Sequence, residues 1–152
     1  MALSIETPEN LLSKGEYLEY LWITLKGPMG YRNGYIRIPP GHPWVDLADY
    51  EIPVEVHGGI TFSDRDTEDE TARFIGFDCG HAGDAPDPGL IPNRMEKYYT
   101  EFPSLRGYGI VRSQAYVEGQ CRSVCAELWK EQQRHDASVL QRKIEMEKNY
   151  LP

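Results

Sequence analysis

Residues 113–130 read SQAYVEGQCRSVCAELWK, and their apolar side chains recur at the spacing of an α-helix. The residues that share one stripe at a period of 3.6 are Val117, Cys121, Val124, Cys125 and Leu128. After residue 109 only Gly119 and Pro152 remain as helix-breaking residues, so a continuous helix is predicted from residue 113 onward. Because an apolar stripe of this kind has to be buried, we expect the helix to lie across a sheet.

The first two-thirds of the chain contain short apolar segments between turn signals, which is the pattern of a β-sheet. Strands are predicted at residues 17–25, 35–38, 54–62 and 72–77. Short helices are predicted at residues 7–15, where Thr7 and Pro8 form a helix-start signal, and at residues 93–100. These elements predict an α+β fold, in which an antiparallel meander of about four strands is covered by the long C-terminal helix.

The simplest division of the chain is a single α+β domain over residues 1–135 and a polar helical tail over residues 136–152. The tail keeps a thin apolar seam that consists of Val139, Leu140 and Ile144. Such a seam is typical of a helix that pairs with another subunit, and the alternative is a frayed end. We therefore expect a homo-oligomer.

Composition excludes several classes of function. The 152 residues include 24 acidic and 16 basic side chains, and the net charge of −8 disfavours binding to DNA or to anionic lipid. No apolar run approaches the roughly 20 residues of a membrane span, and residues 1–15 lack the pattern of a secretion signal. The three cysteines are an odd number without a disulfide-framework spacing, which favours a reducing cytoplasm.

Two segments combine a histidine with glycines beside a predicted strand: residues 56–63, VHGGITFS, and residues 76–84, GFDCGHAGD. Glycine lets the backbone approach a ligand closely. If the two strands form a hairpin whose tip is the acidic loop 64–70, His57 lies near Asp78 and His81. The sequence therefore predicts a shared pocket, and the structural alternative is that Asp78 and His81 only hydrogen-bond a glycine-rich turn.

Phosphate is one ligand that this region suits. No lysine occurs between residues 27 and 96, but Arg37 and Arg73 are present, and arginine makes flat bidentate contacts with phosphate. Tyr31 is placed to stack on a nucleobase. The alternative for each arginine is an ion pair with a nearby acid.

Metal binding is a second hypothesis for the same segments. Asp78, His81 and Asp84 are spaced three apart and, together with His57, offer carboxylate and imidazole ligands for zinc, manganese or iron. No Cys-x-x-Cys pair and no two-histidine helical motif supports this hypothesis. It is kept as an alternative to a site without a cofactor.

The blocks at residues 34–44, 54–63 and 76–84 resemble a group of small phage and prophage proteins of unassigned function. The resemblance covers roughly residues 20–130 and contains no catalytic signature, so it assigns no residue a role. Small acidic phage proteins often act against host defence. One such class is the sponge, which sequesters cyclic nucleotide or cyclic ADP-ribose signals, usually as an oligomer. The resemblance therefore implies an anti-defence protein in the host-cell cytoplasm, by analogy of class alone.

These observations favour a binding protein over an enzyme, with a small phosphorylated ligand such as a cyclic nucleotide. The predicted ligand-binding residues are Tyr31, Arg37, His57, Arg73, Asp78 and His81. One alternative is a metal-dependent phosphodiester hydrolase, in which His57, Asp78, His81 and Asp84 hold zinc or manganese and activate water. Another is a protein–protein inhibitor of a host enzyme that acts through the acidic surface and the tail.

Overall fold

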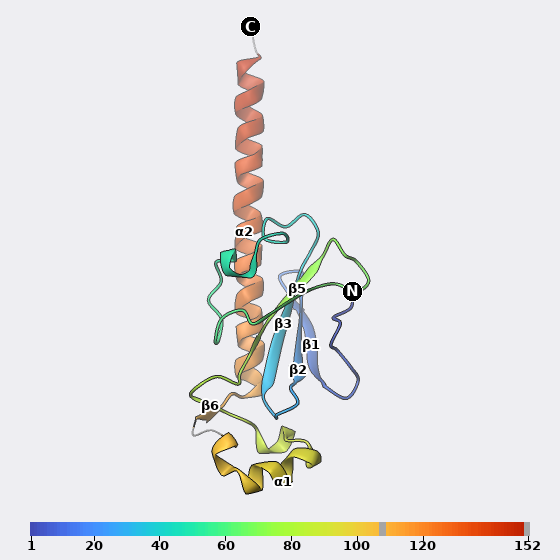
Figure 1. The fold of residues 1–152 in the computed structure, drawn as a ribbon. Helices are drawn as coiled ribbons and strands as arrows, with labels where there is room; N and C mark the ends of the chain where they lie inside the picture. The colour runs from blue at the N-terminus through green and yellow to red at the C-terminus, as the bar shows by residue number, and fades with distance from the viewer. Residues whose placement is uncertain (107–108, 151–152) are drawn as a thin grey trace.

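The computed structural model describes residues 1–106 and 109–150. Within them, five antiparallel strands form the main sheet in the order β1-β2-β3-β5-β4, and α2 packs across β2 and β3 (Figure 1). The strands are β1 (Leu11–Tyr17), β2 (Tyr20–Lys26), β3 (Arg32–Ile38), β4 (Phe62–Arg65) and β5 (Arg73–Asp78), and the helices are α1 (Asn93–Glu101) and α2 (Gln114–Asn149). Short 3₁₀ turns η1 (Asp49–Glu51), η2 (Pro88–Leu90) and η3 (Pro103–Arg106), and a parallel pair of β6 (Asp84–Ala85) with β7 (Ile110–Val111), complete the chain. The α+β prediction is confirmed, with five strands in place of about four. The predicted meander is wrong at one edge, because β5 and not β4 pairs with β3.

The helix predicted at residues 7–15 is wrong, because β1 occupies Leu11–Tyr17. Residues 18 and 19 form a tight turn in which both residues have positive φ, and this turn folds β1 back onto β2. Gly15 pairs with Trp22, and an added Cβ would lie 2.5 Å from the indole ring. Gly15 is therefore the position at which β1 leaves room for the large side chain of Trp22. Strand pairing therefore overrides the local helix-start signal.

The strand predicted at residues 54–62 is also wrong for all but its last residue. The strand β4 begins at Phe62, and Gly58 and Gly59 both adopt left-handed backbone with φ of 69° and 78°. This conformation turns the chain sharply, so His57 lies in a loop before the strand. By contrast, β5 agrees with its prediction to within one residue and pairs with β3 on one side and β4 on the other.

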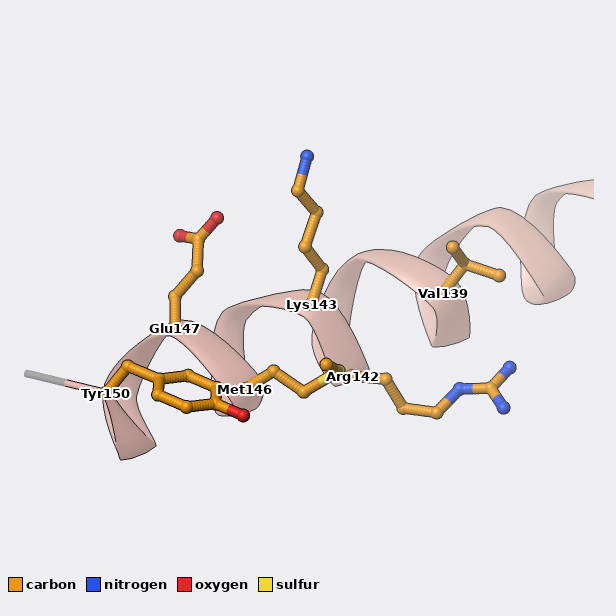
Figure 2. Close-up of a pocket in the computed structure, with 6 residues that line it drawn as sticks. All are labelled: Val139, Arg142, Lys143, Met146, Glu147 and Tyr150. Carbon is orange, nitrogen blue, oxygen red and sulfur yellow. The ribbon is translucent and has the colours of Figure 1, made fainter.

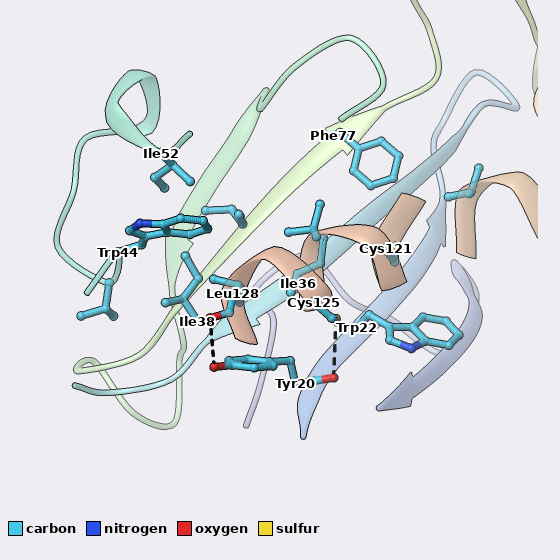
Figure 3. Packing of buried hydrophobic residues seen from close by; sticks show 14 of the residues in the cluster. Tyr20, Trp22, Ile36, Ile38, Trp44, Ile52, Phe77, Cys121, Cys125 and Leu128 are labelled. Atoms are coloured by element: carbon cyan, nitrogen blue, oxygen red, sulfur yellow. Dashed lines mark hydrogen bonds between the residues drawn. The ribbon is translucent and has the colours of Figure 1, made fainter. Parts of the chain in front are cut away.

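The main core lies between α2 and the sheet. The apolar stripe of α2 is buried as predicted, and its members pack against residues such as Trp22, Ile36, Ile38 and Phe77 (Figure 3). Ser113 caps the helix by accepting a hydrogen bond from the backbone N–H of Tyr116. The thiol of Cys125 donates to the carbonyl oxygen of Tyr20 over 3.8 Å. The prediction of a helix lying across the sheet is therefore confirmed.

A second, smaller core covers the opposite face of the sheet, where Leu3, Ile23, Leu25, Tyr35 and Phe74 are buried together. The helix predicted at residues 93–100 is confirmed as α1. The helix α2 continues past the sheet to Asn149, and residues 151–152 of the predicted tail lie outside the described part of the chain. None of the helices in residues 1–106 and 109–150 combines the length and the apolar character that crossing a membrane requires.

Candidate functional site

His57 is the centre of a hydrogen-bonded cluster between the loops and α2. Its Nε2 lies 2.7 Å from Asp84 Oδ2, and its Nδ1 lies 2.8 Å from the hydroxyl of Tyr116. Its backbone N–H donates to Oε1 of Gln120 over 3.0 Å. Because an ionised carboxylate only accepts, Nε2 carries the proton, and in the neutral ring Nδ1 accepts the proton of the Tyr116 hydroxyl. Both ring nitrogens are therefore engaged, and the loop is fastened to the helix.

Asp84 joins the other members of this cluster. Its side chain is buried, and its Oδ1 accepts from Nε of Arg112 over 2.8 Å, while Oδ2 also accepts from the backbone N–H of His81 over 3.1 Å. Burial alone would raise the pKa of Asp84, but the hydrogen bonds from Arg112, His57 and the His81 backbone hold this pKa below its ordinary value. The carboxylate is thus kept charged inside the protein.

Chain topology explains how Arg112 reaches Asp84. Asp84 is the first residue of β6, which pairs in parallel with β7, and Arg112 directly follows β7. The guanidinium of Arg112 also lies 5.2 Å from the ring centroid of Tyr116, in a cation–π contact. The pairing of β6 with β7 therefore places the guanidinium of Arg112 between the buried carboxylate of Asp84 and the ring of Tyr116.

A second pair lies outside this buried cluster. Nε2 of His81 is 3.2 Å from Oδ1 of Asp78, whose Oδ2 accepts a hydrogen bond from the hydroxyl of Thr61 over 2.9 Å. The alignment of Nε2 is too poor for a hydrogen bond, so the contact with Asp78 is ionic when the imidazole is protonated. About a third of each side chain is exposed, at 34% for His81 and 36% for Asp78. The rings of His57 and His81 are 6.1 Å apart, which places this exposed pair beside the buried cluster.

Gly58 makes the position of His81 possible. Its φ of 69° lies in the left-handed region, and an added Cβ would lie 2.2 Å from Nε2 of His81. No other residue leaves room for the imidazole at this point. The glycine that follows His57 in the sequence is therefore explained by packing, because Gly58 leaves room for His81 from the second glycine-rich segment.

Tyr31 belongs to the same neighbourhood. Its ring carbon Cδ2 lies 3.5 Å from the position of a Cβ on Gly80, in the loop that carries His81. Burial raises the pKa of Tyr31, and the negative charge of Asp84 adds to the shift. Tyr31, His57, Asp78 and His81 are therefore neighbours in the structure, and a shared ligand pocket among them stays a prediction.

The same prediction is wrong for Arg37 and Arg73, which lie elsewhere. Nε of Arg37 bonds Oδ2 of Asp66 over 2.7 Å, and Arg73 bonds the carboxylate of Asp49 and the carbonyl oxygen of Leu47. Arg73 begins β5 whereas Asp78 ends it, and the rise of a strand separates the two by about 16 Å. Both guanidinium groups are used to hold loops.

The four predicted metal ligands are arranged as two separate pairs, His57 with Asp84 and His81 with Asp78. Within residues 1–106 and 109–150, no three His, Cys, Asp or Glu side chains are grouped so as to hold a metal ion. His57 and Asp84 are joined by a hydrogen bond, whereas Nε2 of His81 and Oδ1 of Asp78 are in close contact without one.

Sequence reasoning missed Tyr116, Gln120 and Arg112. Tyr116 and Gln120 are one helical turn apart and flank the buried stripe of α2, so helical periodicity could have shown that they face one neighbour. No local pattern assigned that neighbour as His57, because 59 residues separate Tyr116 from it. No protein-family model, curated protein or solved structure matches this chain.

Proposed function

We propose that the chain binds a small phosphorylated ligand of the nucleotide class at the surface formed by His81, Asp78 and Tyr31. The observation that carries the proposal is the convergence of the His81 imidazole, the Arg112 guanidinium and the Tyr31 ring, from three separate segments of the chain, beside the buried pair of His57 and Asp84. Imidazole and guanidinium are donors suited to phosphate oxygens, and a tyrosine ring offers a face on which a base stacks.

Arg112 supplies the positive charge of the proposed site, and His81 supplies an imidazole donor. Arg112 uses only its Nε toward Asp84 among the described residues, and its side chain is 26% exposed, so its Nη groups are oriented by the protein and still accessible. His81 is held by Gly58 and Asp78 and is partly exposed. A phosphate between these groups would receive charge-assisted hydrogen bonds from both.

The buried part of the cluster supports a functional role. Removing Asp84 from water is costly, and buried ion pairs are often no more stabilising than apolar side chains of the same volume. Networks of this kind cluster at functional sites because they fix the orientation of the groups next to them. Here the Asp84 network orients His57 and Arg112 and accepts the backbone N–H of His81.

A biological setting follows from the resemblance to small phage proteins. The proposed ligand is a nucleotide-derived signal of host defence, and the protein would act as a sponge in the host-cell cytoplasm. All three cysteines are free and buried, which fits a reducing compartment.

Isothermal titration calorimetry with linear and cyclic nucleotides, and with inorganic phosphate as a probe of the phosphate subsite alone, tests the proposal. We expect at least one nucleotide to bind, and His81→Gln or Arg112→Gln to weaken its binding at least about tenfold. His135→Gln is the matched control, because His135 is exposed on α2 far from the site. Absence of measurable binding across the panel, or equal loss in the control, would contradict the proposal.

The same preparation tests the hydrolase alternative. A metal-dependent phosphodiesterase would contain zinc or manganese by elemental analysis and would convert a cyclic nucleotide to a linear one. Binding without turnover, in protein that lacks both metals, is the result that the proposed function requires.

A further inference from the structure

The second half of α2 leaves the body of the molecule. Leu128 is the last fully buried residue of the helix, and every residue from Gln133 to Tyr150 is exposed. At 1.5 Å per residue this segment is about 27 Å long. Figure 1 shows it extending past the sheet and its loops. A helix of this length is marginal in water unless one of its faces is packed.

The large apolar side chains of this segment lie on one half of the helix. At about 100° of rotation per residue, a single arc of about 180° contains Trp129, Val139, Leu140, Ile144, Met146 and Tyr150. Each is between 38% and 84% exposed, and the opposite half contains only polar side chains such as Arg134 and Glu145. Figure 2 shows part of the apolar half, where Val139, Met146 and Tyr150 line a shallow hollow together with charged neighbours.

A row of residues with the spacing of a coiled coil also follows this apolar half. It is called the seam below, and it differs from the short apolar seam of Val139, Leu140 and Ile144 named in the sequence analysis. Its residues recur at alternating intervals of four and three: Gln132, Asp136, Val139, Lys143, Met146 and Tyr150. Only two members of the seam are charged, and they have opposite signs. They are Asp136 and Lys143, which lie at equal distances on either side of a point between Val139 and Leu140.

We propose that this seam pairs with the same seam of a second copy of the chain, in antiparallel orientation. A twofold axis close to Val139 and Leu140 brings Asp136 of each copy level with Lys143 of the other, to within one helical turn, so the ion pair forms twice. The same register brings Trp129 level with Tyr150 of the second copy. A parallel pair would instead oppose Asp136 to Asp136 and Lys143 to Lys143. Charge complementarity therefore selects a copy of the chain as the occupant and sets its direction.

The charge of the remaining chain favours the same orientation. Residues 130–150 contain five basic and four acidic side chains and therefore have a net charge of +1. Because the whole chain has a net charge of −8, the remaining residues have a net charge of −9. A parallel dimer would place two bodies of charge −9 side by side. An antiparallel dimer separates them by the overlap of the helices, which is about 30 Å and exceeds the Debye length at physiological salt.

Sedimentation velocity on the full chain, from about 1 to 100 µM, tests the dimer. We expect a concentration-dependent dimer, and Val139→Glu with Leu140→Glu should weaken it at least about a hundredfold. The matched control is Ser138→Glu with Gln141→Glu, which adds the same charge on the polar half. All four positions are exposed, so circular dichroism should show an intact fold in both variants. A wild-type monomer over the whole range, or equal dissociation in the control, would overturn the proposal.

Disulfide cross-linking tests the orientation. In the antiparallel register Gln132 is level with Glu147 of the second copy, whereas Gln132 of the two copies is about 22 Å apart. Mixing Gln132→Cys protein with Glu147→Cys protein under oxidation should give mainly the mixed disulfide, and the three native cysteines are buried. A parallel pair would give each self-disulfide instead, and that result would overturn the orientation.

Discussion

Replacing Gly58 with alanine should displace His81 while leaving the fold intact. The added methyl group would lie 2.2 Å from Nε2 of His81, which is buried, but the side chain as a whole is 34% exposed, so the ring can move towards solvent. Alanine at a φ of 69° costs about 1–2 kcal/mol of backbone strain, and loss of the partly exposed pair with Asp78 adds at most about 1 kcal/mol. For a chain of this size each kcal/mol lowers Tm by roughly 2–4 °C.

Gly59→Ala separates strain from displacement. Gly59 has a similar φ of 78°, but an added Cβ meets nothing within 4 Å. The two variants should therefore lose similar stability in thermal unfolding, with the difference below about 1 kcal/mol. Only Gly58→Ala should shift the imidazole resonances of His81 in a proton–carbon NMR spectrum and weaken nucleotide binding at least about tenfold. Equal shifts of these resonances in both variants would show that His81 is not held by Gly58.

Three further predictions concern buried groups. Asp84→Asn should lower the free energy of unfolding by about 2–3 kcal/mol in urea at pH 7, because the charged acceptor of several hydrogen bonds is lost. Hydrogen bonds from the Ala2 backbone and from Arg37 outweigh the effect of burial and lower the pKa of Asp66 from 3.8 to about 2. Because the folded pKa is depressed, about 2 kcal/mol of stability present above pH 4 should be lost as the pH falls towards 2, and Asp66→Asn should remove this dependence in urea titrations. Burial raises the pKa of Cys79 and of Cys125 to about 12, so iodoacetamide at pH 8 should label neither thiol until the protein unfolds, as mass spectrometry can show.

Long-period patterns in the sequence predicted the fold well. The stripe of α2 is a property of one helix, so it could be recognised without knowledge of the partner that covers it. Residues 7–15 were predicted wrongly because Thr7 and Pro8 are a local helix-start signal, whereas β1 forms through pairing with Trp22 and its neighbours. The strand predicted at residues 54–61 is wrong for a different reason. Their alternation of apolar residues is interrupted by two glycines that turn the backbone.

The candidate site was predictable only in part. The convergence of His57 with Asp78 and His81 followed from placing two segments on adjacent strands, although His57 lies in a loop and not in β4. The partners Tyr116 and Arg112 required the docking of α2 and the pairing of β6 with β7, and neither contact has a sequence signature. The sequence could therefore indicate where the polar groups gather, but not which of them satisfy one another.

Several arginines of this protein anchor its long connections. Among the described residues, five of them pair with a carboxylate in or beside an irregular segment: Arg32 with Asp87, Arg37 with Asp66, Arg65 with Asp46, Arg73 with Asp49 and Arg112 with Asp84. A guanidinium presents five donors in a rigid fork, so it can hold a carboxylate and a backbone carbonyl at once, which the single ammonium of lysine does less well. Arg32 shows this use, since it bonds Asp87, the carbonyl oxygen of Arg112 and the side chain of Gln114. This use of the guanidinium group explains why residues 27–96 contain arginine and no lysine, since arginine side chains hold the loops of this region. Of these five guanidinium groups, that of Arg112 bonds the carboxylate that His57 also contacts, so a phosphorylated ligand at the proposed site would depend on Arg112 together with His81.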